Sequence, residues 1–90
     1  MKNAYLNAIR AQIDRARRLQ ASNCIRWEVG EDERTDPTLV SRRAYGTSLH
    51  TDVVMVACGT EGIWQPLPRG EIILPTLLQL QALRQRFGLG

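Results

Sequence analysis

The sequence has few of the residues that metal and redox sites most often need. Its 90 positions include one histidine, two cysteines, two tryptophans, two tyrosines and one phenylalanine. Cys24 and Cys58 belong to no CxxC pair and no Cys/His cluster, so the sequence predicts no metal site and no redox motif. We expect both cysteines to be small, free core residues, because a cytosolic chain disfavours a disulfide.

Long hydrophobic runs are also missing. No apolar stretch approaches the roughly 18 to 20 residues that a membrane span needs, and the N-terminus lacks the apolar centre of a signal peptide. We therefore expect a chain with no membrane span that is made in the cytoplasm. Its length predicts one modest core without a deep cleft, and its composition, 43% hydrophobic and 23% charged, is that of a globular chain.

Carboxylate pairs are the remaining candidates for a catalytic centre. Glu61 and Glu71, or two acidic residues within 31–36, could serve as the paired carboxylates of a glycosidase. The alternative is a solvated loop, and the chain offers no second domain to form a substrate cleft. His50 has no Ser-His-Asp or Cys-His arrangement around it. The sequence thus predicts no enzyme, no catalytic residue and no cofactor.

Charge is distributed unevenly along the first half of the chain. Residues 1–20 carry five basic residues against Asp14 alone, whereas residues 21–40 carry two basic residues against five acidic ones. This pattern describes a basic arm followed by an acidic loop, which suits electrostatic contacts with neighbouring proteins at least as well as nucleic acid. We take Arg17 and Arg18 of the arm, and Glu31, Asp32 and Glu33 of the loop, as candidate partner-binding residues. DNA binding is disfavoured because the basic segment has no interleaved aromatic residues and no helix-turn-helix pattern.

Amphipathic helices are predicted at both ends of the chain. Apolar residues recur every three or four positions over residues 3–20, and again after Thr76, which caps a final helix that Gly88 ends. Two alternatives follow: these stripes face a partner, or they pack on each other and complete one core. The candidate partner-binding residues on the stripes are Tyr5, Ile9, Ile13, Leu80, Leu83 and Phe87.

Two short strands and two short helices are predicted between these ends. Alternating apolar residues favour a strand over about 24–29, and a second strand over 71–74 ends at Pro75. Asp36-Pro37 is typical of a helix start, and Tyr45-Gly46 of a helix end. A further helix should begin with Ser48 as its cap and end at Gly59. Its valines also suit a buried strand, but the glycine stop favours a helix.

The aromatic residues could stack on a sugar or a base. Trp27 occupies an inward-facing strand position, two residues from Ile25 and two from Val29, so we expect it in the core. Trp64 lies in the proline-rich turn, where exposure and burial are equally compatible with the sequence, and we include it among the candidate partner-binding residues.

The central stretch resembles a LysM module. The resemblance covers about residues 25–75, and its most specific parts are Tyr45-Gly46 and the segment from Leu67 to Pro75, Leu-Pro-Arg-Gly-Glu-Ile-Ile-Leu-Pro. Among LysM-like proteins the chain is most similar to small tail proteins of contractile-tailed bacteriophages, namely the tail protein X family and baseplate wedge proteins with an embedded LysM-like domain. The phage-like features are the run from Arg42 to Gly46, the helix around Asp52 and the proline-rich turn.

The resemblance implies an α+β fold, a β-α-α-β module with a two-stranded antiparallel sheet and flanking helices. Residues 1–23 would form an N-terminal arm, 24–75 the module and 76–90 a C-terminal helix. It further implies a virion structural protein of the tail or baseplate that docks on tube, hub or wedge subunits. The alternative is a module that binds N-acetylglucosamine in peptidoglycan. The insertion over residues 30–39 and Cys58 fall near the edges where glycan-binding members hold the sugar, which disfavours this alternative.

Overall fold

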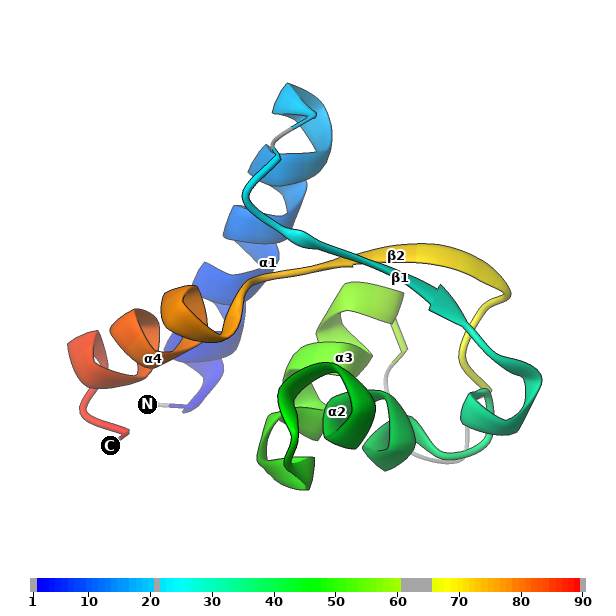
Figure 1. Cartoon of the computed structure of the whole chain (residues 1–90). Helices are drawn as coiled ribbons and strands as arrows, with labels where there is room; N and C mark the ends of the chain where they lie inside the picture. Colours follow the sequence, from blue (N-terminus) through cyan, green and yellow to red (C-terminus); the bar gives the residue numbers. More distant parts are fainter. Residues whose placement is uncertain (1, 21, 61–65, 90) are drawn as a thin grey trace.

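The computed structural model describes residues 2–20, 22–60 and 66–89 and has the predicted α+β architecture (Figure 1). In chain order, the elements of the described residues are α1 (Lys2–Leu19), β1 (Ile25–Val29), the 3₁₀ turn η1 (Glu31–Glu33), α2 (Pro37–Tyr45), the 3₁₀ turn η2 (Ser48–His50), α3 (Thr51–Cys58), β2 (Gly70–Leu74) and α4 (Leu77–Arg86). The predicted order of helix, strand, helix, helix, strand and helix is confirmed.

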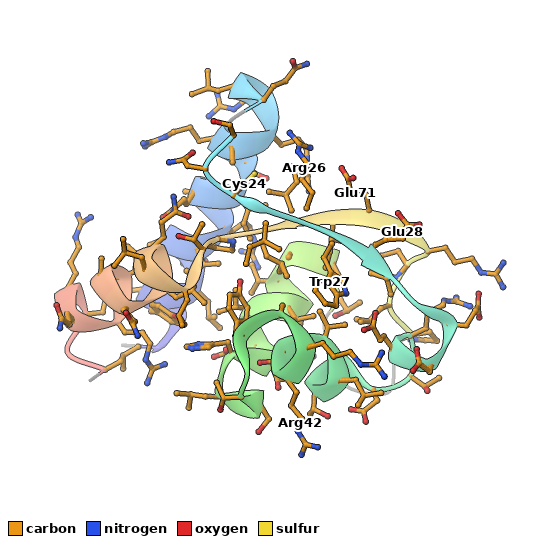
Figure 2. The ribbon with its side chains drawn as sticks, viewed as in Figure 1. Cys24, Arg26, Trp27, Glu28, Arg42 and Glu71 are labelled. Carbon is orange, nitrogen blue, oxygen red and sulfur yellow. The ribbon has the colours of Figure 1, made fainter. Side chains whose placement is uncertain are left out.

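The two strands form an antiparallel ribbon whose two faces differ. Trp27 pairs with Ile72, and Arg26 pairs with Ile73. Because side chains alternate along a strand, Trp27 and Ile72 point toward the helices, as Figure 2 shows for Trp27. Arg26, Glu28 and Glu71 lie on the opposite face and are exposed, and Arg26 and Glu71 form an ion pair at 3.3 Å, whereas Ile73 on this face is buried. A two-stranded sheet needs such packing on one face to be stable.

Both short helices lie on the same side of the ribbon (Figure 1). Helix α2 begins where predicted, because the Asp36 carboxylate accepts a hydrogen bond from the Thr38 backbone N–H at 3.1 Å and Pro37 occupies the first turn. It ends at Gly46, whose φ of 79° lies in the left-handed region that glycine tolerates best.

The second helix begins differently from the prediction. Ser48 is not the cap of α3: His50 occupies that position and makes no side-chain capping hydrogen bond. Ser48 instead begins the 3₁₀ turn η2, which Thr47 caps by accepting a hydrogen bond from the Leu49 backbone N–H at 3.2 Å. The helical alternative for the valine-rich segment is confirmed, and α3 ends at Gly59 as predicted.

The end helices complete the core of the central module. Tyr5 and Ile9 of α1 and Leu80 of α4 are fully buried, and Ile13 is 4% exposed. The Tyr5 and Phe87 rings meet edge to face with their centroids 6.4 Å apart. These residues belong to the same core cluster as Val40, Val53, Val54, Ile72 and Leu74. Of the two alternatives for the apolar stripes, mutual packing into one core is therefore the observed one.

Candidate interaction surfaces

The predicted partner-binding residues of the two stripes need a correction. Tyr5, Ile9 and Leu80 are enclosed by the chain itself, so they cannot face a partner while the fold is intact. Ile13 is 4% exposed and packs in the same core, although its edge reaches a surface groove described below. Leu83 and Phe87 are half-buried and pack against the same core. Helical spacing identifies an apolar face, but it does not say whether the same chain or another covers it.

The acidic turn is organised around a buried carboxylate. Glu33 is 2% exposed, although the sequence predicts a solvated, partner-facing residue. Its Oε1 accepts hydrogen bonds from the Gly30 backbone N–H at 2.7 Å and from the Trp27 indole N–H at 3.1 Å. Its Oε2 accepts one from the Arg43 guanidinium at 2.9 Å. Three donors thus satisfy a carboxylate that would otherwise be costly to bury.

These contacts also fix the ionisation of the turn. Burial alone would raise the pKa of Glu33, but the hydrogen bonds from Gly30, Arg43 and Trp27 together lower that pKa below its usual value. The hydrogen bond from Arg43 is the main reason that the pKa of Asp32 is lowered as well. Both carboxylates are therefore ionised at neutral pH, and both are already paired with Arg43.

The rest of the turn is also paired within the chain. Glu31 forms ion pairs with Arg34 at 3.7 Å and with Arg69 at 3.1 Å. Arg34 donates from Nε to the Leu67 carbonyl at 2.9 Å, and its own carbonyl accepts from the Leu67 N–H at 2.8 Å. The turn after β1 is thus joined to the segment before β2. Glu31 and Asp32 remain at the surface, but their charge is largely balanced by these arginines.

The basic candidates on α1 lie at the surface. The side chain of Arg17 is 58% exposed and sits 3.9 Å from Asp14 one turn earlier, while Arg18 is exposed. An exposed pair of this kind contributes little to stability, because solvent screens it. Arg17 and Arg18 are therefore accessible to a partner, as predicted from the sequence.

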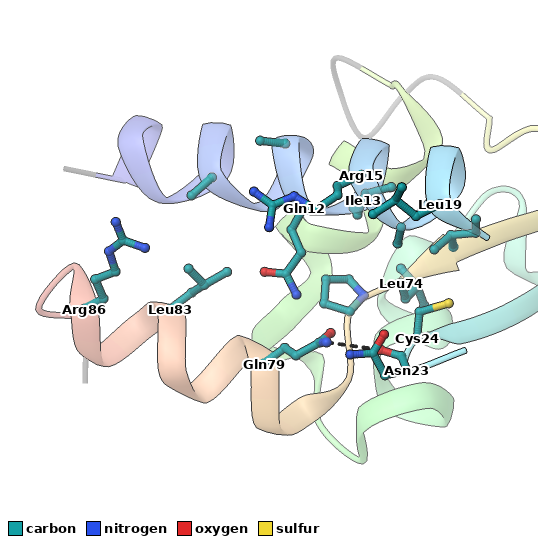
Figure 3. Close-up of a pocket in the computed structure, with 15 residues that line it drawn as sticks. Gln12, Ile13, Arg15, Leu19, Asn23, Cys24, Leu74, Gln79, Leu83 and Arg86 are labelled. Carbon is teal, nitrogen blue, oxygen red and sulfur yellow. Dashed lines mark hydrogen bonds between the residues drawn. The ribbon is translucent and has the colours of Figure 1, made fainter. Parts of the chain in front are cut away.

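A groove lies between α1, α4 and the end of β2 (Figure 3). It encloses about 570 Å³, and most of its walls are apolar. Residues of α1 form one side and residues of α4 the other, with Leu74 between them (Figure 3). The lining residues are Ala8, Ala11, Gln12, Ile13, Arg15, Ala16, Leu19, Asn23, Cys24, Ile73, Leu74, Pro75, Gln79, Leu83 and Arg86.

The sequence did not reveal this groove. Ile13 and Leu83 are predicted interface residues and contribute to its wall, whereas the sequence pattern does not mark Ala8, Ala11 or Arg15 as interface residues. Their signal is weak, because alanine is a good helix former on any face of a helix. The structure brings together Ile13 and Leu83, and it leaves Arg17, Arg18 and the acidic turn outside the lining of the groove.

The remaining candidate residues divide between the core, the surface and the undescribed segments. Trp27 is half-buried and packs against the core, as expected. Trp64 and Glu61 lie outside the described residues. Glu71 is exposed and paired with Arg26 on the sheet.

His50 and the two cysteines are the remaining candidate nucleophiles and metal ligands. His50 is 3% exposed, and burial, its largest influence, lowers its pKa. Both cysteines are half-buried, and burial raises the pKa of Cys58 to about 11, so its thiol remains protonated at neutral pH. Among residues 2–20, 22–60 and 66–89, no three His, Cys, Asp or Glu side chains gather closely enough to hold a metal ion. None of the described helices has the length and apolar character of a membrane span.

Comparisons with known proteins found no match among protein-family models, curated proteins or solved structures. The function of the chain is therefore inferred from its residues and from how the fold arranges them.

Proposed function

We propose that the chain is a non-catalytic LysM-like adaptor, a structural component of a contractile bacteriophage tail or baseplate that docks on neighbouring tail subunits. In this role the protein is made in the host cytoplasm and becomes part of the virion. Its partners are tube, hub or wedge subunits.

One observation carries the proposal. The two most specific parts of the LysM resemblance, Tyr45-Gly46 and the segment ending at Pro75, lie 30 positions apart in sequence, and the Tyr45 hydroxyl donates a hydrogen bond to the Pro75 carbonyl at 2.7 Å. Tyr45 is buried beneath the ribbon, and Gly46 ends α2 beside it. A motif whose distant parts meet in this way is stronger support than either part alone.

The arrangement of elements also supports the proposal. Strand β1, helices α2 and α3, and strand β2 follow the order expected of a LysM module, with antiparallel strands and both helices on one face. The added helices α1 and α4 enlarge the core and present exposed arginines and an apolar groove. Helices that add exposed surface to the module suit a subunit that must contact several neighbours.

The peptidoglycan alternative receives less support from the geometry. The turn after β1 is linked to the segment before β2 by the two Arg34–Leu67 hydrogen bonds and by the Glu31–Arg69 ion pair. These contacts occupy part of the edge at which the LysM resemblance would place a sugar.

Deleting the coding sequence from the phage that carries it tests the adaptor role. We expect non-infectious particles with incomplete tails in electron micrographs, rescue by the chain supplied in trans, and detection of the chain in purified tails by mass spectrometry. Infectious phage in normal yield without the chain would refute the proposal. Sedimentation of the purified chain with peptidoglycan sacculi would instead support the glycan-binding alternative.

A further inference from the structure

We infer that the groove between α1 and α4 is the docking site for an amphipathic α-helix of a partner protein, with apolar residues on one face and carboxylates flanking them. This inference names the chemistry of one partner and rests on the adaptor role proposed above.

The shape of the groove suits a helix. Its α1 wall includes three small side chains, Ala8, Ala11 and Ala16, among the larger Gln12, Ile13, Arg15 and Leu19, and its α4 wall is formed by Gln79, Leu83 and Arg86. Helices pack with their axes about 8 to 10 Å apart, and small residues at the contact allow the closest approach. Two helices that face each other across an open, mostly apolar groove can therefore accept a third helix along it.

An exposed leucine in the lining marks the groove as an incomplete apolar surface. Leu19 lines the groove at the end of α1 and is 71% exposed. An apolar side chain in an open apolar groove gains free energy from a partner that removes it from water.

The charge of the groove selects the flanks of the partner helix. Arg15 and Arg86 are the charged residues among the described residues that line it, and none of these described residues carries a carboxylate. Neither arginine forms an ion pair with a described residue, although Arg86 lies over the Phe87 ring at 5.9 Å. Carboxylates beside the apolar stripe of the incoming helix would form ion pairs with these two arginines.

The same charges disfavour a second copy of this chain as the occupant. Helix α1 carries arginines at positions 10, 15, 17 and 18 against Asp14, and α4 carries Arg84 and Arg86 without an acidic residue. Docking either helix into the groove of another copy would bring like charges together. The acidic turn cannot supply the carboxylates either, because its acidic residues are paired within the chain.

A titration with two synthetic helices tests the inference. Both peptides are about 20 residues long and carry leucines at helical spacing; one has glutamate flanks and the other lysine flanks. We expect the glutamate peptide to bind the ¹⁵N-labelled full chain about tenfold more tightly and to shift amide signals of residues 8–19 and 79–86, since two charge pairs change from repulsive to attractive. Equal affinities, or shifts confined to other residues, would overturn the inference.

Matched variants identify the site. Ala11→Trp should fill the groove and weaken binding at least tenfold, whereas Asn7→Trp, which places the same bulk at an exposed position of α1 outside the groove lining, should not. Arg15→Glu combined with Arg86→Glu should reverse the preference toward the lysine peptide. Two observations would refute a helical partner: a dimer of the unliganded chain whose interface is the groove, or a DNA duplex that shifts the same amides at lower concentration than the glutamate peptide.

The two proposals fail separately. Normal tails assembled with Ala11→Trp in place of the natural chain would overturn the groove inference and leave the adaptor role intact. A chain that binds the glutamate peptide but is dispensable for tail assembly would overturn the adaptor role alone.

Discussion

The acidic turn and the α1/α4 groove both concentrate charge, yet only the turn resolves it internally. In the turn, Glu33 is buried with three donors, and Arg43 forms ion pairs with both Glu33 and Asp32. In the groove, Arg15 and Arg86 lie beside an apolar surface, and none of the described lining residues carries a carboxylate. The difference teaches that a charged segment in the sequence does not by itself indicate a partner of opposite charge, because its charges can be paired within the same chain.

The largest expected effect comes from removing the buried carboxylate of the turn. Glu33→Ala should lower the free energy of unfolding by about 3 kcal/mol, because Trp27, Gly30 and Arg43 lose their common acceptor. Urea denaturation followed by circular dichroism measures this change. Glu28→Ala removes an exposed glutamate from the preceding strand β1 and should change the free energy of unfolding by less than about 0.5 kcal/mol. Equal effects of the two substitutions would contradict the claim that the internal contacts of Glu33 stabilise the fold.

Acidification should weaken the turn and not the groove. The pKa values of Glu33 and Asp32 lie below their ordinary values of 4.5 and 3.8, so the folded chain holds fewer protons than the unfolded chain in acid. The stability that these groups contribute is present above the ordinary values and is lost as pH falls through the lowered ones. Thermal unfolding between pH 6 and pH 2.5 measures the loss, and Glu33→Gln should show a shallower dependence. An unchanged dependence would contradict the pairing of Glu33.

His50 should make the stability depend on pH in a second, less acidic range. Burial, assisted by the charge of Arg84 and opposed by Asp52, lowers the pKa of His50 below 6.5. The unfolded chain therefore takes up a proton first, and stability should fall as pH drops below about 6.5, reaching a plateau beneath the lowered pKa. His50→Gln should remove this fall between pH 7 and pH 5.5, because His50 is the one histidine of the sequence. A variant that retains the fall would refute the assignment.

The smallest effect is expected at the groove. Arg15→Glu with Arg86→Glu should change the free energy of unfolding by less than about 0.5 kcal/mol, since neither arginine pairs with a carboxylate in the described chain. The urea midpoint at pH 7 is the measurement. A loss comparable to that of Glu33→Ala would mean that the groove arginines serve the fold and not a partner.

Local signals in the sequence predicted the elements well. Asp36, Gly46 and Gly59 act within a few residues of themselves, so their capping roles could be recognised without the tertiary structure. The cap predicted at Ser48 is misplaced, because the 3₁₀ turn η2 intervenes and moves the start of α3 to Thr51.

Contacts between distant residues explain what the sequence could not reveal. Glu33 is buried because α2 places Arg43 beside it and β1 places Trp27 above it, and neither relation follows from spacing alone. The stripe of Tyr5 and Ile9 was evident, but its cover comes from the other end of the chain. The groove depends on the separation of two helices, which no local pattern encodes.

The contact between Tyr5 and Phe87 has a consequence for biosynthesis. It joins residues near the two ends of the chain, and β1 must likewise wait for β2 to be made. Loops of this length close slowly, because much chain entropy is lost before their contacts form. The core can therefore close only after Phe87 has left the ribosome, so a nascent chain, or one terminated before this residue, would expose the α1 stripe and be a substrate for chaperones and proteases.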